Sequence, residues 1–214
     1  MAKFEIMIPF ILAMESGVWI RQNETLEQLF ARAKAKGIKR EPADPGGDTL
    51  CGVTATTFKS YFGSRKLETM KYEDWVNIFR KMFWDKVKAD NIKNQGIANL
   101  IVDWCWHSGV GVIKKIQTLL KVSPDGIIGP ITLKAIEEWN ADVLFLAIKN
   151  LRLKYYDTII AKSIAAYERK IGRKATAAEL IVHTSKRFER GWRNRVSYLQ
   201  INRIFVPGYL DIKF

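Results

Sequence analysis

The chain has 214 residues, 48% of them hydrophobic, and a formal net charge of +13 at pH 7. This length is sufficient for one sizeable core or two small subdomains, and no apolar run approaches the roughly 18 residues that a membrane-spanning helix needs. Two cysteines and two histidines are too few for a disulfide scaffold or an evident zinc centre, and no C-x-x-C, H-E-x-x-H or P-loop pattern occurs. We therefore expect no metal, no cofactor and no stable insertion into a membrane.

The excess of positive charge indicates a polyanionic partner, for which nucleic acid, anionic lipid head groups and the anionic bacterial envelope all qualify. The sequence carries no recognised nucleic-acid-binding motif. The simpler alternative is that scattered lysines form a solvated basic surface that only keeps the protein in solution.

An apolar run over residues 4–16 predicts a first helix that Pro9 starts or kinks and that ends at Glu15-Ser16-Gly17. Ile11 and Leu12 precede Glu15 by four and three residues, so we expect its carboxylate beside a hydrophobic stripe. Removal from water favours the protonated carboxyl, which a general acid working near neutral pH needs. The alternative is an ordinary glutamate near a helix C-terminus, where solvent offsets the unfavourable dipole.

A second predicted helix, over residues 25–37, precedes a turn-rich stretch at residues 44–54. Asp44-Pro45-Gly46 predicts a tight turn, because proline fixes φ at about −65° and glycine supplies the positive φ that the next position needs. Thr49 and Gly52 follow, so we expect a small irregular hairpin. A plain surface loop has the same composition, and that alternative stays open at this point.

Glu15-Ser16-Gly17 and residues 44–54 together resemble the signature of glycoside hydrolase family 108, the N-acetylmuramidase endolysins of phages and prophages. A looser likeness holds to phage-type lysozymes, in which a glutamate ending the first helix is followed by aspartate and threonine on a hairpin. The resemblance implies that Glu15 is the catalytic acid and that Asp44 and Thr49 orient a water molecule. The sequence departs from the family pattern at Ser16 (usually glycine), Val18 (often tyrosine), Glu41-Pro42 (usually Asp-Pro) and in a long insertion, residues 18–40.

Three further helices are predicted before residue 110, over residues 55–62, 72–89 and 96–108. Asp103 and His107 lie four positions apart on one face of the last of them. They can bind each other structurally or line a groove that contacts substrate. The resembled family commonly has Asn-x-Gly-like residues near the cleft at this point, so His107 is a departure.

The second half of the chain is predicted to be helical as well, over residues 110–121, 130–139, 140–167 and from Thr176 onward. Residues 124–132, Pro-Asp-Gly-Ile-Ile-Gly-Pro-Ile-Thr after Ser123, resemble the loop of peptidoglycan-binding modules, although a plain helix–turn–helix linker has the same turn chemistry. A Gly-Trp-x-Asn-Arg segment at residues 191–195 also fits the resembled family. Trp192 within it either stacks on a sugar or packs the last helix.

The fold class that follows is mainly α, a lysozyme-like helical fold with a small irregular hairpin and a C-terminal helical subdomain. We expect a catalytic region at residues 1–109 and a peptidoglycan-binding-like region at residues 110–214, packed as one globular unit.

The resemblance implies a peptidoglycan hydrolase that cleaves the β-1,4 bond between N-acetylmuramic acid and N-acetylglucosamine, with Glu15 as general acid. The resemblance also implies that peptidoglycan glycan strands are the partner and that a holin serves for export. We expect no nucleic-acid partner. Because cleavage after the apolar N-terminal run would remove Glu15, we expect no signal peptide and a chain that stays cytoplasmic until its release to the periplasm or cell wall. Two other classes stay open: a non-catalytic peptidoglycan-binding module and a basic nucleic-acid-binding protein.

Overall fold

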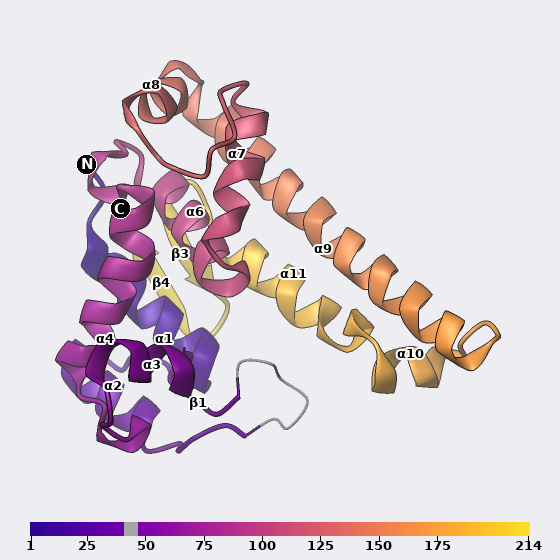
Figure 1. Cartoon of the computed structure of the whole chain (residues 1–214). Coiled ribbons are helices and arrows are strands. Elements are labelled where there is room, and N and C mark those ends of the chain that lie inside the picture. Colours follow the sequence, from indigo (N-terminus) through magenta and orange to yellow (C-terminus); the bar gives the residue numbers. More distant parts are fainter. Residues whose placement is uncertain (41–46) are drawn as a thin grey trace.

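The computed structural model describes residues 1–40 and 47–214, and its fold is mainly α and lysozyme-like, as the sequence predicts. Figure 1 shows a helical body that contains both chain ends, with one long helix projecting from it. The helices in chain order are α1 (Ile8–Ser16), α2 (Leu26–Lys34), α3 (Ala55–Phe62), α4 (Tyr72–Phe79), α5 (Asp85–Val87), α6 (Gln95–Ser108), α7 (Ile113–Leu119), α8 (Pro130–Glu138), α9 (Ala141–Ile171), α10 (Ala177–His183) and α11 (Glu189–Tyr198).

Two small antiparallel sheets complete the described fold. One joins β1 (Thr49–Leu50) to β2 (Val53–Thr54), with Thr49 opposite Thr54. The other joins β3 (Arg203–Val206) to β4 (Leu210–Lys213), with Arg203 opposite Lys213. The first sheet lies within the predicted hairpin region (residues 44–54) and turns at Cys51-Gly52. The turn predicted at residues 44–46 lies outside the described residues, and the second sheet was not anticipated.

The core is organised around α6, which is buried continuously from Gly96 to Cys105. Trp104 of this helix is fully buried, as are Trp75 and Trp84 from neighbouring segments. Burying a large apolar side chain contributes roughly 1.5–3 kcal/mol, so these rings hold α6 firmly between its neighbours. The last turns of α6 are therefore a rigid support for polar side chains that reach the surface.

Helix α1 carries Glu15 to the point where the chain leaves the core. Pro9 lies in the first turn of the helix, where a proline removes no hydrogen bond, and a short 3-10 turn (Phe4–Met7) precedes it. Residues 8–13 are all buried, and Gly17 ends the helix in the left-handed conformation with φ +73°. Glu15 thus sits at the end of an almost wholly apolar helix, as expected.

Helices α9, α10 and α11 form the projecting part of the molecule. In Figure 1, α9 leads away from the body, α10 lies at its far end, and α11 returns alongside α9, which it contacts. The side chain of Asn140 caps α9 by accepting a hydrogen bond from the Val143 amide, and the helix continues to Ile171, four residues past the predicted end.

The predicted single helix from Thr176 onward is wrong, because the chain breaks at Thr184. This residue has an extended backbone (φ −129°, ψ 169°), and its hydroxyl accepts a hydrogen bond from the Lys186 amide. A 3-10 turn (Ser185–Phe188) then leads into α11. A threonine side chain that captures a nearby amide offers the backbone an alternative to helix, which explains the interruption.

The helix predicted over residues 72–89 is likewise divided, by a π-helical segment (Arg80–Trp84), and ends at Lys88 in the left-handed conformation. Cys51 and Cys105 are both free and buried. Within residues 1–40 and 47–214, no helix combines the length and apolarity needed to cross a bilayer.

Candidate active site

Glu15 is held by two hydrogen-bond donors from distant parts of the chain. Its Oε1 accepts from Trp106 Nε1 at 2.9 Å and from Arg195 Nη1 at 2.8 Å. The three residues come from the ends of α1, α6 and α11. The carboxylate is largely shielded from solvent, but it faces a guanidinium and an indole N–H rather than only the apolar stripe that the sequence predicted.

The β1–β2 hairpin packs directly on the Glu15 side chain. Gly52, in the turn of this hairpin, has φ +80°, and a Cβ built there would lie 2.6 Å from Glu15 Cγ and 2.7 Å from Trp106 Cζ2. Lys39, which pairs with Thr49 through the backbone, donates its ammonium to the Glu15 carbonyl. The hairpin therefore closes over the carboxylate, and only glycine permits that approach.

If Glu15 is the catalytic acid that the resemblance implies, Gly52→Ala lowers activity sharply, by roughly 100-fold for a shift of the carboxylate of about an ångström. The added methyl group collides with the Glu15 side chain and forces it, or the hairpin, to move. Gly37→Ala is the matched control, because Gly37 has the same φ of +80° and nothing within 4 Å of its Cβ position. Activity equal in the two variants, measured on purified peptidoglycan, would show that this contact is unimportant.

A buried charge network lies behind Glu15. Arg195 donates Nε and Nη2 to Asp103 Oδ1 at 2.9 and 2.8 Å, and Arg152 Nη2 lies 2.7 Å from Asp103 Oδ2. Burial raises the pKa of Asp103, but the attraction of Arg195 and Arg152 outweighs it and lowers the pKa to about 2. Asp103 is thus an anion that balances two buried cations.

The network continues toward the surface through aromatic side chains. Arg152 Nε donates to the Tyr156 hydroxyl at 2.8 Å, and this hydroxyl lies 3.0 Å from His107 Nδ1. The Trp192 ring packs against both Tyr156 and His107, with centroid distances of 5.0 and 5.7 Å. Polar and aromatic groups from α6, α9 and α11 therefore converge beside Glu15.

An open pocket of about 680 Å³ is bounded by Glu15, His107 and Trp192, among others. Phe188 and Trp192 are stacked at an interplanar angle of 20°, with their centroids 5.7 Å apart. Both rings line the pocket. Trp192 also packs against Tyr156, and the Arg187 guanidinium lies over the Phe188 ring. Among the described residues, the lining consists of Met14, Glu15, His107, Phe188, Gly191, Trp192, Asn194, Arg195 and Tyr198.

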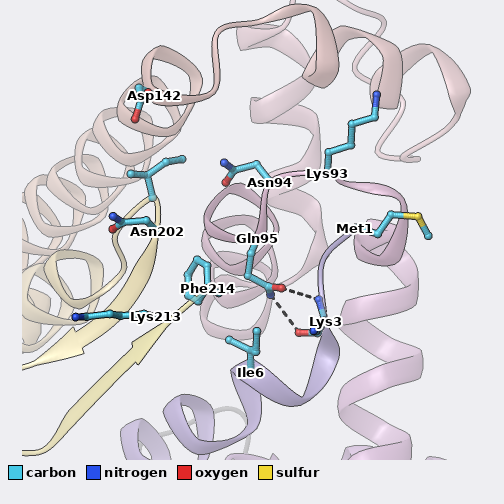
Figure 2. A pocket seen from close by; sticks show the side chains of 11 residues that line it. Met1, Lys3, Ile6, Lys93, Asn94, Gln95, Asp142, Asn202, Lys213 and Phe214 are labelled. Carbon is cyan, nitrogen blue, oxygen red and sulfur yellow. Dashed lines mark hydrogen bonds between the residues drawn. The ribbon is translucent and has the colours of Figure 1, made fainter.

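A second pocket, of about 650 Å³, lies near the chain ends (Figure 2). Its polar lining includes Lys3, Lys93 and Lys213, with Asp142 as its carboxylate. The Gln95 amide there accepts from the Lys3 amide at 2.6 Å and donates to the Lys3 carbonyl at 3.1 Å, so it is engaged locally. This pocket lacks a carboxylate clamped by buried donors, and the first pocket is the better candidate for chemistry.

Two family models match the chain. Residues 32–109 match the family model described as Glycosyl hydrolase 108, and residues 112–197 match the model described as Predicted Peptidoglycan domain. This chain is a glycoside hydrolase family 108 protein with a C-terminal peptidoglycan-binding region. It is accordingly a glycoside hydrolase with a peptidoglycan-related role, and peptidoglycan is its partner.

The family 108 chain is also similar to a solved structure, that of Brucella abortus SagA. The two are 26% identical, the match covers 79% of this chain and 90% of the other, and the TM-score is 0.57. No curated protein sequence matches the chain significantly.

Three of the predicted site residues of this family 108 protein, Glu15, His107 and Trp192, line the same pocket. Asp103 does not reach it, because it is fully buried and engaged by arginines, so neither of its predicted roles is seen: it neither lines a groove nor binds His107 directly. Thr49 lies in β1 of the hairpin that covers Glu15, outside the set of described residues that line the pocket. Asp44 lies outside the described residues.

Sequence reasoning missed Trp106, Arg152 and Arg195 as parts of the site. Arg195 ends the Gly-Trp-x-Asn-Arg segment, three positions after Trp192 and so on the same side of α11, which is the signal that could have identified it. In the described part of the chain, no cluster of three or more His, Cys, Asp or Glu side chains could hold a metal ion.

The pH dependence of stability should reveal the burial of His107. Burial, reinforced by Arg195 and Arg152 and opposed by Asp103, lowers the pKa of His107 from 6.5 to about 3. Between these values the unfolded chain binds a proton that the folded chain excludes, so stability falls as the pH drops below about 6.5 toward 3. We expect His107→Gln to show a smaller loss of melting temperature than wild type on acidification.

His183→Gln serves as the control, because His183 is exposed on α10 and lies outside the network. Melting temperatures are measured by circular dichroism. If the melting temperature of His107→Gln fell on acidification as much as that of wild type, His107 would not be neutral and buried.

Proposed function

We propose that this protein is an N-acetylmuramidase that hydrolyses the β-1,4 bond between N-acetylmuramic acid and N-acetylglucosamine in peptidoglycan. Glu15 acts as the general acid in this proposal. The finding that the chain has a glycosyl hydrolase 108 region joined to a peptidoglycan-binding region supports the substrate class.

The observation that carries the proposal is the arrangement of the Glu15 carboxylate. Hydrogen bonds from Trp106 and Arg195 both end on Oε1, at the edge of a pocket large enough for sugar units. Within the described residues, Oε2 is the oxygen that these donors leave available to carry a proton. Glycoside hydrolysis needs a carboxyl group in this position to protonate the leaving oxygen.

Hydrolysis also needs a nucleophile or an activated water on the other face of the sugar. We assign the positioning of this water to Asp44 and to Thr49, of which Thr49 lies in the hairpin whose turn packs on Glu15. Under this assignment, a separation of roughly 6.5–9.5 Å between the Glu15 and Asp44 carboxyl groups leads to inversion, and about 5 Å leads to retention.

The pocket wall provides the features expected of a glycan-binding surface. The Phe188 and Trp192 rings give this wall an apolar part that can contact a pyranose, and Asn194 lies on the same wall as a hydrogen-bonding side chain. The net charge of +13 favours accumulation at an anionic cell wall, an attraction that weakens as salt rises. We place the action of the enzyme in the periplasm or cell wall, after release from the cytoplasm through a holin.

Digestion of purified sacculi with the wild-type protein tests the proposal. The fragments are reduced with borohydride, separated and identified by mass spectrometry. The expected products are muropeptides that end in reducing N-acetylmuramic acid. Fragments ending in reducing N-acetylglucosamine would indicate a glucosaminidase, and sacculi that are bound but uncut would indicate a non-catalytic binding module.

A further inference from the structure

The hydrogen bond from Arg195 to Glu15 connects the first helix to the last helix, across 180 positions of the sequence. Glu15 precedes the region matched by the glycosyl hydrolase model, whereas Arg195 lies inside the region matched by the peptidoglycan-domain model. We propose that Arg195 is a positioning residue for Glu15, and that the C-terminal region completes the catalytic centre in addition to any binding of the wall. This inference rests on the proposed role of Glu15.

Each of the three nitrogen atoms of the Arg195 guanidinium donates a hydrogen bond to a carboxylate. Nε and Nη2 bind Asp103, and Nη1 binds Glu15. A planar guanidinium held by two donors on one carboxylate cannot rotate, so the direction of the third donor is set as well. The side chain is only 7% exposed, which removes the competing water that would loosen this geometry.

A second layer holds Asp103 in place. Arg152, from the middle of α9, pairs with the other oxygen of Asp103 and donates to the Tyr156 hydroxyl. Both cations of the network therefore come from the C-terminal half, while the two carboxylates come from α1 and α6. Separating the halves would leave Asp103 and Glu15 without their arginine partners, which distinguishes this architecture from a catalytic domain with a detachable binding module.

Lysine cannot reproduce this role. Its ammonium is a single point on a flexible stem, so it can neutralise Asp103 but cannot hold Asp103 and Glu15 in one rigid plane. Arg195→Lys should therefore keep the fold while allowing Glu15 to move. Because misplacement of a reacting group by about an ångström costs roughly 100-fold, we expect kcat to fall by about that factor with KM little changed.

The test compares four full-length variants on soluble peptidoglycan fragments: Arg195→Lys, Arg195→Ala, Glu15→Gln and Arg193→Ala. Arg193 is the matched control, since it lies on α11 but pairs at the surface with Glu189 and Asp157. Added methylguanidinium should restore part of kcat in Arg195→Ala, and it should do nothing for Glu15→Gln. Circular dichroism and sacculus binding establish that each variant is folded and still binds.

The proposal is overturned if Arg195→Lys keeps the kcat of the Arg193→Ala control. It is also overturned if Arg195→Lys loses sacculus binding and raises KM at unchanged kcat, because Arg195 would then act in binding. Should Arg195→Ala not fold, the kcat of Arg195→Lys decides the matter alone. A Glu15→Gln variant that stays active would instead refute the proposed function, so the two failures are distinguishable.

Discussion

Glu15→Gln is expected to lower the rate of peptidoglycan hydrolysis by roughly 10²–10⁴-fold, the usual contribution of a general acid. The amide has nearly the same shape as the carboxyl group, and its oxygen can still accept from Trp106 and Arg195. Its N–H protons are far too weakly acidic to be transferred to the leaving oxygen. The release of reducing ends from sacculi measures the loss, and thermal unfolding shows whether the fold is retained.

Glu27→Gln is the control for this experiment, since Glu27 is an exposed residue in the first turn of α2. It makes the same chemical change without touching the pocket and should leave the rate unaltered. If Glu15→Gln released reducing ends at the rate of Glu27→Gln, Glu15 would not be the acid.

Asp103→Asn should cost roughly 3–5 kcal/mol of unfolding free energy, because removing one partner of a buried ion pair leaves an uncompensated charge. Here two arginines depend on the same carboxylate, and Arg152 is completely buried. Arg152 Nη1 has no hydrogen-bond partner among the described residues, so Asp103 provides most of the compensation for that cation. Urea unfolding monitored by circular dichroism gives the difference directly.

Asp157→Asn is the matched comparison, because Asp157 pairs with Arg193 at the surface and both side chains are about half exposed. Exposed ion pairs contribute about 1 kcal/mol or less. A loss of stability in Asp103→Asn no greater than in Asp157→Asn would mean that the network is not a major source of stability.

The local features of the fold could be predicted from short stretches of sequence. Thr54 caps α3, whose bounds are those predicted, and Pro130 starts α8 directly after Gly129. These features depend on hydrogen bonds within three or four residues and on the fixed φ of proline, so the neighbouring sequence determines them. The same holds for Glu15 at the end of an apolar helix.

Other local elements were missed although their signals were present. Residues 203–206 alternate buried and half-buried side chains before Pro207 and Gly208, the pattern of a short hairpin strand. The break at Thr184 arises because one hydroxyl competes with the helix for backbone donors. Such competition is decided by small energy differences that a periodic pattern does not reveal.

The sequence by itself determined the mainly helical class, the hairpin, the family and the position of Glu15. Only the tertiary structure decided which donors hold Glu15 and that Asp103 is buried beneath the site instead of lining it. The reason is physical: Arg195, Asp103 and Glu15 meet through the packing of α1, α6 and α11, and contacts across 92 and 180 positions depend on that packing as a whole.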